Sequence, residues 1–179
     1  MGTTPATEMA AYENALCTMR TDSAAETYEL GVRLGRLLHP GDVLALQGDL
    51  GAGKTTMAQG VARGLGVEGY VRSPTFTLVN EYDLSSGARL FHIDGYRLGE
   101  TMDEAVLEAD TFGLDQVLDD PDAIVIIEWA ERLAALLPAD RLEVALNYVD
   151  HAHNARILTC RARGPRSAVL VKQLLQEAT

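Results

Sequence analysis

VLALQGDLGAGKTTMAQGVARG, residues 43–64, carries three signals in succession. Residues 43–47 are a short apolar run followed by a glycine, which is typical of a buried strand. Residues 48–55 satisfy the pattern G-x-x-x-x-G-K-(S/T), and residues 54–64 have helical composition that closes at Gly64 and Gly66. A glycine-rich loop between a strand and a helix is the context in which this pattern binds phosphate. The segment therefore predicts an α/β domain built around a phosphate-binding loop.

The residue types of the loop explain why it would bind ATP. Glycines allow successive backbone N–H groups to converge on an anion, and the following helix adds the positive end of its dipole. We expect Lys54 to bridge the β- and γ-phosphates, Thr55 to bind Mg²⁺ and Thr56 to reach the α-phosphate. The alternative is a glycine-rich turn with a solvated lysine. The predicted loop contacts are Gly48, Asp49, Leu50, Gly51, Ala52, Gly53, Lys54, Thr55 and Thr56.

Two acidic residues stand at the ends of apolar runs elsewhere in the chain. Asp94 follows residues 90–93, and Glu128 follows residues 125–127. Because ligands of parallel α/β sheets gather at the carboxyl ends of the strands, either acid could complete a Mg²⁺ shell beside the loop. The alternative for each acid alone is a solvated strand end. His92, inside the first of these runs, is more typical of a core histidine than of a base.

The remaining pattern predicts a single α/β P-loop NTPase domain with a mixed central sheet, a parallel core and flanking helices. We expect residues 21–179 to form this domain and residues 1–20 to be a poorly ordered extension, in which residues 9–19 could add a helical turn or two. The predicted elements are a helix capped at Ser23, strands at residues 76–82 and 89–93, an interrupted helix at 101–118, a strand at 123–127, strands at 141–148 and 155–161, and a helix at 167–177.

Composition limits the possible functions. The chain has 179 residues and a formal net charge of −11, which argues against direct binding of nucleic acid, since a phosphate backbone requires a basic surface. Two cysteines are too few for a disulfide scaffold, and no secretory leader precedes the domain, so we expect a cytoplasmic protein. No apolar run is long enough to span a bilayer, so we expect no membrane association.

Four motifs together resemble one family. They are the loop GDLGAGKTT at residues 48–56, SPTFTL at 73–78, HIDGYRL at 92–98 and IEW at 127–129. Their order and spacing resemble those of the bacterial TsaE family over about residues 21–162. The resemblance implies an ATPase that acts with the TsaD and TsaB proteins in making N6-threonylcarbamoyladenosine at position 37 of tRNA. It also implies that TsaD transfers the carbamoyl group, that ATP turnover resets the complex, and that tRNA is contacted only indirectly.

The resemblance also assigns roles to individual residues. Thr55 and Glu128 would serve Mg²⁺, and Asp94 would contribute to the metal site and to hydrolysis. Trp129 would lie beside the nucleotide and report its binding, and residues 22–24 would contribute weakly matched adenine contacts. The mobile switch of the family corresponds to Ser73, Pro74, Thr75 and Phe76. Gly95 departs from the family, which often has a bulkier residue at this position, and the first twenty residues have no counterpart.

Three other functions compete with the ATPase reading. A small-molecule P-loop kinase would share the loop and use Asp94 as a base, but no acceptor site or arginine-rich lid is visible. A GTP-binding switch would require an Asn-Lys-x-Asp guanine motif, and residues 80–83, NEYD, lack the lysine. An adaptor could hold the nucleotide as a structural ligand without hydrolysing it, in which case neither Asp94 nor Glu128 would affect turnover.

Overall fold

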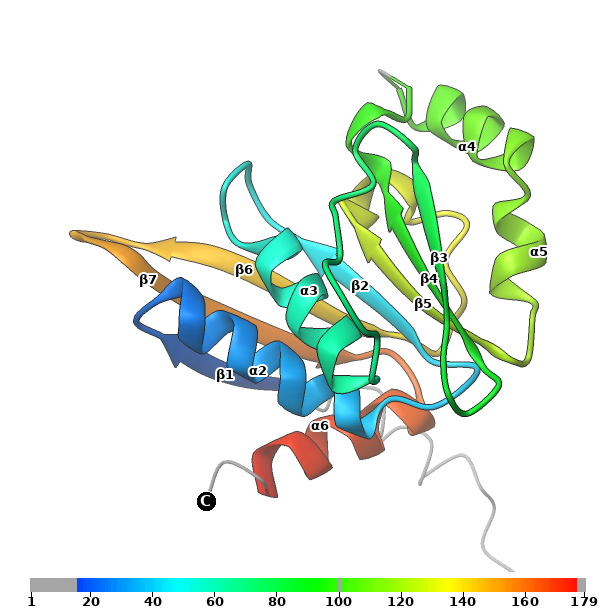
Figure 1. Ribbon diagram of the computed structural model, residues 1–179. Coiled ribbons are helices and arrows are strands. Elements are labelled where there is room, and N and C mark those ends of the chain that lie inside the picture. Colours follow the sequence, from blue (N-terminus) through cyan, green and yellow to red (C-terminus); the bar gives the residue numbers. More distant parts are fainter. Residues whose placement is uncertain (1–15, 100, 177–179) are drawn as a thin grey trace, which may run out of the picture.

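The chain folds around a seven-stranded sheet, seen in a computed structural model that describes residues 16–99 and 101–176 (Figure 1). The strand order is β1-β7-β6-β2-β5-β4-β3, and the four inner strands, β6, β2, β5 and β4, run parallel. The outer pairings are antiparallel. This arrangement confirms the predicted mixed sheet with a parallel core. The strands are β1 (Leu16–Thr21), β2 (Val43–Gln47), β3 (Val79–Asp83), β4 (Arg89–Asp94), β5 (Ala123–Glu128), β6 (Leu142–Val149) and β7 (Ala152–Ala162).

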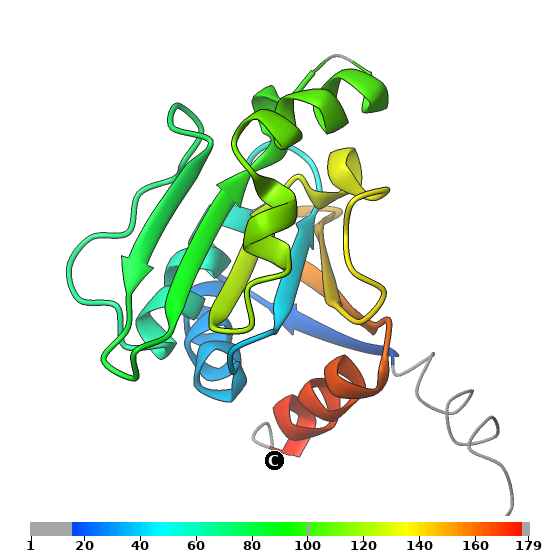
Figure 2. The same ribbon diagram turned by 90° about the vertical axis from the view of Figure 1, so that its right-hand side faces the viewer.

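Helices cover both faces of the sheet (Figures 1 and 2). Strand residues alternate between two buried clusters, so Leu44 and Leu46 of β2 pack toward α2, α3 and α6, whereas Val43 and Ala45 pack toward α4, α5 and η2. Every residue of β5 is buried, as expected for a parallel strand covered on both sides. The helices are α2 (Ala24–Leu37), α3 (Lys54–Gly64), α4 (Met102–Thr111), α5 (Leu114–Leu118), α6 (Pro165–Gln176) and the short 3₁₀ segments η1 (Gly95–Arg97) and η2 (Ala130–Leu133). Within the described ranges no helix has both the length and the apolar character to cross a membrane.

Glycines bring α2 and α3 into backbone contact. A Cβ added to Gly60 would lie 2.1 Å from the carbonyl oxygen of Tyr28, and one added to Gly35 would lie 2.2 Å from that of Val61. Gly31 and Gly64 meet the opposite backbone in the same way. Since α3 begins at the end of the glycine-rich loop, this contact fixes the helix that carries the loop against the body of the domain.

Most predicted elements are confirmed close to their expected ends. The oxygen of Ser23 accepts a hydrogen bond from the amide of Glu26 at the start of α2, β2 and α3 have the predicted bounds, and Gly113 separates α4 from α5 in a left-handed conformation. The expected hairpins are also present, although β7 begins earlier than predicted, at Ala152.

Two expectations differ from the structure. The strand expected from residue 76 begins at Val79, because the amide of Leu78 donates to the carbonyl of Pro74 and closes a turn first. Residues 16–20, expected in the N-terminal extension, belong to β1, which pairs with β7 along its whole length and forms one edge of the sheet. The rest of that extension, residues 1–15, lies outside the described residues.

Replacing Gly60 at the contact between α2 and α3 tests whether backbone packing or helix propensity has the larger effect on stability. Helix propensity alone predicts that Gly60→Ala stabilises α3 by about 1 kcal/mol. Because the added methyl group would meet the backbone of Tyr28, we expect the free energy of unfolding to fall by about 2 kcal/mol or more instead. Urea denaturation followed by circular dichroism measures the change. A stabilised Gly60→Ala variant would show that the two helices are not in close contact.

Candidate functional site: a pocket at the carboxyl edge of the sheet

The loop between β2 and α3 has the geometry of an anion-binding turn. Gly48, Gly51 and Gly53 all have positive φ angles, and a Cβ at Gly48 would lie 2.4 Å from the carbonyl oxygen of Leu146. At Gly48, glycine is therefore required both by the positive φ angle and by the lack of space for a Cβ atom. No side chain caps the first turn of α3, whose N-cap is Gly53. The free N–H groups of a helix start are the donors that phosphate binds.

Lys54 is held at the mouth of this loop. Its Nζ donates to the carbonyl oxygens of Gly48 at 2.6 Å and Asp49 at 2.9 Å, and it lies 3.6 Å from the centroid of the Trp129 ring. Burial lowers the pKa of the ammonium below the ordinary lysine value, and nearby carboxylates, Glu128 foremost, oppose that shift. A cation is thus already positioned where the loop would receive a phosphate.

Glu128 connects the loop helix to the core of the sheet. Its Oε2 accepts a hydrogen bond from the Thr55 hydroxyl at 2.7 Å, and its Oε1 lies 2.8 Å from Nε2 of His92. Because a carboxylate can only accept, the proton of this contact is assigned to Nε2. The side chains of His92 and Glu128 are fully buried, and Nδ1 of His92 has no partner among the described residues. The parallel register that pairs Leu46 and Asp94 with Glu128 brings these groups to one edge.

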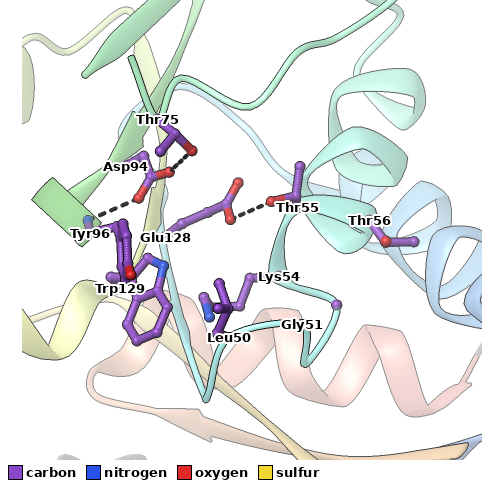
Figure 3. Close-up of a pocket in the computed structure, with 11 residues that line it drawn as sticks. Leu50, Gly51, Lys54, Thr55, Thr56, Thr75, Asp94, Tyr96, Glu128 and Trp129 are labelled. Atoms are coloured by element: carbon purple, nitrogen blue, oxygen red, sulfur yellow. Dashed lines mark hydrogen bonds between the residues drawn. The ribbon is translucent and has the colours of Figure 1, made fainter. Parts of the chain in front are cut away.

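Asp94 lies next to Glu128 and binds the segment after α3. Its Oδ2 accepts from the Thr75 hydroxyl at 2.6 Å and, at a longer 3.4 Å, from the hydroxyl of Ser73. Its Oδ1 accepts from the backbone N–H of Tyr96 at 2.9 Å. These contacts tie residues 73–75, which lie between α3 and β3, to the end of β4. Figure 3 shows the Thr75 and Tyr96 bonds on opposite oxygens of the carboxylate.

These side chains surround one pocket of about 270 Å³. Ten of the eleven residues that line it were predicted as site residues, and Tyr96 is the addition (Figure 3). The ring of Tyr96 lies 5.0 Å from that of Trp129, between centroids. The lining residues are Leu50, Gly51, Gly53, Lys54, Thr55, Thr56, Thr75, Asp94, Tyr96, Glu128 and Trp129.

Six predicted residues do not line this pocket. Gly48, Asp49 and Ala52 belong to the loop, and the carbonyl oxygens of Gly48 and Asp49 accept hydrogen bonds from Lys54, which does line the pocket. Ser73 and Pro74 precede Thr75, which does line the pocket, and Ser73 reaches Asp94 only at the longer distance above. The side chain of Phe76 is turned outward, 84% exposed, with its ring 4.4 Å from the guanidinium carbon of Arg97.

A smaller pocket of about 120 Å³ adjoins the first across the loop. It shares Gly51, Gly53 and Thr56 with the first pocket and adds Ala24 and Thr27 from the start of α2. Its other wall comes from the β6–β7 hairpin, through Asn154 and Arg156. Sequence reasoning missed these hairpin residues, because no motif marks them and only the pairing of β6 with β7 carries them to the loop.

The fold and this site define a class: an α/β protein with a P-loop at the carboxyl end of a central parallel strand. The chain superposes on the crystal structure of Bacillus subtilis YdiB with a TM-score of 0.76 and 31% identity, covering 93% of this chain and 98% of that one. A family profile described as "Threonylcarbamoyl adenosine biosynthesis protein TsaE" matches residues 21–157. The chain belongs to the TsaE family.

Curated relatives agree with this assignment. A tRNA threonylcarbamoyladenosine biosynthesis protein TsaE of Streptomyces coelicolor is 40% identical over 143 residues, which cover 78% of this chain and 93% of the relative. The Bacillus subtilis protein of the same name is 36% identical over 155 residues, or 87% of this chain and 91% of the relative. The resemblance stated from the four sequence motifs is therefore confirmed at the level of the family.

Trp129 allows the environment of Lys54 to be measured, because it is the one tryptophan of the chain. Burial disfavours the charged form of Lys54, so the ammonium above the indole should lose its proton below the ordinary lysine value of 10.5. We expect the emission of Trp129 to change in a step whose midpoint lies below that pH. Lys54→Met should abolish the step while leaving any contribution from tyrosine ionisation. If the emission of Trp129 changed with pH in the same way in both proteins, the contact between Lys54 and Trp129 would be contradicted.

The bond between His92 and Glu128 should contribute strongly to stability. His92→Ala leaves a cavity and an unpaired buried carboxylate oxygen, so we expect the free energy of unfolding to fall by about 3 kcal/mol. His92→Gln, whose amide can still donate, should recover part of the loss. Urea denaturation at neutral pH compares the two variants. Equal stability of His92→Ala and the unmodified chain would exclude this role.

Proposed function

We propose that this chain is the Mg²⁺-dependent, ATP-binding and ATP-hydrolysing subunit that acts with TsaD and TsaB in forming N6-threonylcarbamoyladenosine at position 37 of tRNA. The observation that carries the proposal is the hydrogen bond between Thr55 and Glu128, which joins the first turn of the loop helix to a buried acid at the next strand end. Membership of the TsaE family supplies the biological process.

Phosphate binding follows from the loop and the helix behind it. The first turn of α3 lines the pocket and has no side-chain cap, and Lys54 would supply the positive charge that the β- and γ-phosphates require. Thr56 lines both pockets, so a triphosphate across the first pocket places its nucleoside end toward the second. The second pocket includes Ala24, which agrees with the adenine contacts that the resemblance implies for residues 22–24.

The donor set at the pocket fits Mg²⁺. Thr55, Glu128 and Asp94 offer hydroxyl and carboxylate oxygens, the ligands that this hard cation prefers. The described residues contain no cluster of three or more His, Cys, Asp or Glu side chains able to hold a metal ion alone. Mg²⁺ in NTPases does not need such a cage, since phosphates and water complete its shell. A Mg²⁺ ion held by these residues would supply positive charge to offset that of the phosphates.

Asp94 is proposed to act in hydrolysis because of its position and its partners. It lines the pocket beside Glu128, and both of its oxygens are held by hydrogen bonds, so its orientation is fixed. The bond from Thr75 connects Asp94 to residues 73–76. A segment tied to a site carboxylate by a hydroxyl is suited to respond when a terminal phosphate enters or leaves.

The partnership with TsaD and TsaB is consistent with the charge of the chain. A net charge of −11 opposes direct binding to a tRNA backbone, so contact with tRNA through partner proteins is the simpler arrangement. A site completed by a partner also explains why we expect slow hydrolysis by the isolated chain, as P-loop sites are often ordered in trans.

Two substitutions separate binding from turnover. Lys54→Ala should abolish ATP binding, whereas Glu128→Gln should bind ATP within a few-fold of the unmodified chain but lose on the order of 100-fold in Mg²⁺-dependent turnover with TsaD and TsaB. Isothermal titration calorimetry measures binding, and phosphate release measures turnover. Glu29→Gln, at an exposed position of α2, is the matched control and should change neither.

Formation of threonylcarbamoyladenosine on tRNA is the second readout. Both site variants should prevent repeated rounds of modification by the three-protein mixture, because ATP turnover is proposed to reset it. Rapid phosphorylation of a nucleoside or sugar by the chain alone, or turnover unaffected by TsaD and TsaB, would contradict the proposal. Unchanged turnover in Glu128→Gln would remove the metal role of that residue.

A further inference from the structure

Three consecutive carbonyl groups of the phosphate-binding loop are hydrogen-bonded by side chains of the β6–β7 hairpin. The hydroxyl of Tyr148 donates to the oxygen of Leu50 at 2.7 Å. Arg156 donates from Nη2 to the oxygen of Gly51 at 3.2 Å and from Nε to that of Ala52 at 3.0 Å. A segment distant in sequence thus binds the loop at every position from 50 to 52.

Arg156 is itself fixed within the hairpin. Its Nη1 donates to the carbonyl oxygens of His153 at 2.8 Å and Ala155 at 2.7 Å, and its guanidinium carbon lies 4.3 Å from the centroid of the Tyr148 ring. With the two bonds to the loop, four of the five N–H donors of an arginine are used on backbone carbonyls. The guanidinium is therefore a rigid link between hairpin and loop rather than a mobile surface charge.

The sheet places the two side chains together. Tyr148 and Arg156 are partners in the antiparallel register of β6 and β7, directly before a bulge at Val149. The hairpin extends well beyond the neighbouring strands of the sheet (Figure 1). A Cβ at Gly51 would lie 2.8 Å from the Tyr148 hydroxyl, so the tip of this side chain lies directly against the loop backbone.

The direction of these bonds has a consequence for phosphate binding. Within a peptide unit the C=O and N–H groups point in opposite directions, so holding the carbonyls of Leu50 and Ala52 on the hairpin side turns the amides of Gly51 and Gly53, which line the pocket, away from the hairpin. The amide of Ala52 instead donates to the carbonyl of Asp49 at 3.1 Å, so the bond from Arg156 to Gly51 fixes a turn within the loop. A glycine-rich loop would otherwise sample many conformations, and ordering it would reduce affinity. We propose that Tyr148 and Arg156 are positioning residues that hold the loop in its phosphate-binding conformation. The proposal rests on the nucleotide binding proposed above.

A different role for Arg156 would give a different result. Because Arg156 lines the second pocket, it could instead contact the nucleoside directly. Inorganic tripolyphosphate with Mg²⁺ separates the two roles, since it has the phosphates but no nucleoside. A positioning role predicts that tripolyphosphate and ATP lose affinity equally, whereas a nucleoside contact predicts that ATP alone is affected.

The experiment compares three variants by calorimetry with both ligands. Tyr148→Phe keeps the ring and removes one hydrogen bond, so we expect Kd to rise about 5-fold for each ligand. Arg156→Gln removes two charge-assisted bonds and should raise both Kd values about 30-fold. Arg156→Lys keeps the charge but loses the planar fork of N–H donors, so its Kd values should lie between those of the other two variants. The control is Arg161→Gln, which replaces an exposed arginine on the same strand, and its Kd values should stay within 2-fold of those of the unmodified chain.

A merely structural role is excluded by two further readouts. At a temperature well below the midpoint of unfolding, turnover at saturating ATP with TsaD and TsaB should be unchanged in Tyr148→Phe while KM rises. If the variants lose thermal stability but bind tripolyphosphate normally, or if only ATP affinity falls, the positioning role is overturned. If the unmodified chain binds neither ligand, the proposed function itself fails, and this outcome is distinct because it does not depend on the variants.

Discussion

The parallel pairing of β2, β5 and β4 is the constraint on which the site depends. In this register Glu128 stands beside both Leu46 and Asp94, so a strand that precedes the loop and two strands that carry acids end at one edge. The loop can therefore start its helix directly opposite two carboxylates that come from positions far apart in the chain. No single segment could supply this combination, since each contributes one kind of group.

Charges at this edge are stabilised by partners rather than by water. Glu128 is fully buried but is bonded on one oxygen by Thr55 and on the other by His92, and Asp94 is also bonded on both oxygens. Unpaired carboxylates would be costly at this depth. The hydroxyl and imidazole donors keep them in place, so the site has oxygen ligands in fixed orientations and a low-dielectric surrounding in which electrostatic interactions are strong.

The centre of the fold and most of the site follow from local patterns in the sequence. Short apolar runs mark β2 and the strands that end in Asp94 and Glu128. The glycine pattern marks the loop, and helical composition marks α3. The edge strand β1 was missed because its pairing with β7 is non-local and residues 16–21 have no strong pattern of their own. Tyr148 and Arg156 were missed for the same reason. Phe76 was assigned to the mobile switch from its motif, and the outward direction of its ring depends on the turn from Pro74 to Leu78, which the motif did not predict.

The glycine-to-glycine crossing of α2 and α3 separates the rigid wall of the pocket from the adaptable one. Two helices whose main chains touch have no intervening side chains that could change rotamer and let one slide over the other. The side of the pocket formed by the loop and α3 is therefore expected to be rigid. On the opposite side of the pocket, residues 73–75 are attached to Asp94 through the hydroxyl groups of Ser73 and Thr75, contacts that a change of rotamer would be enough to break.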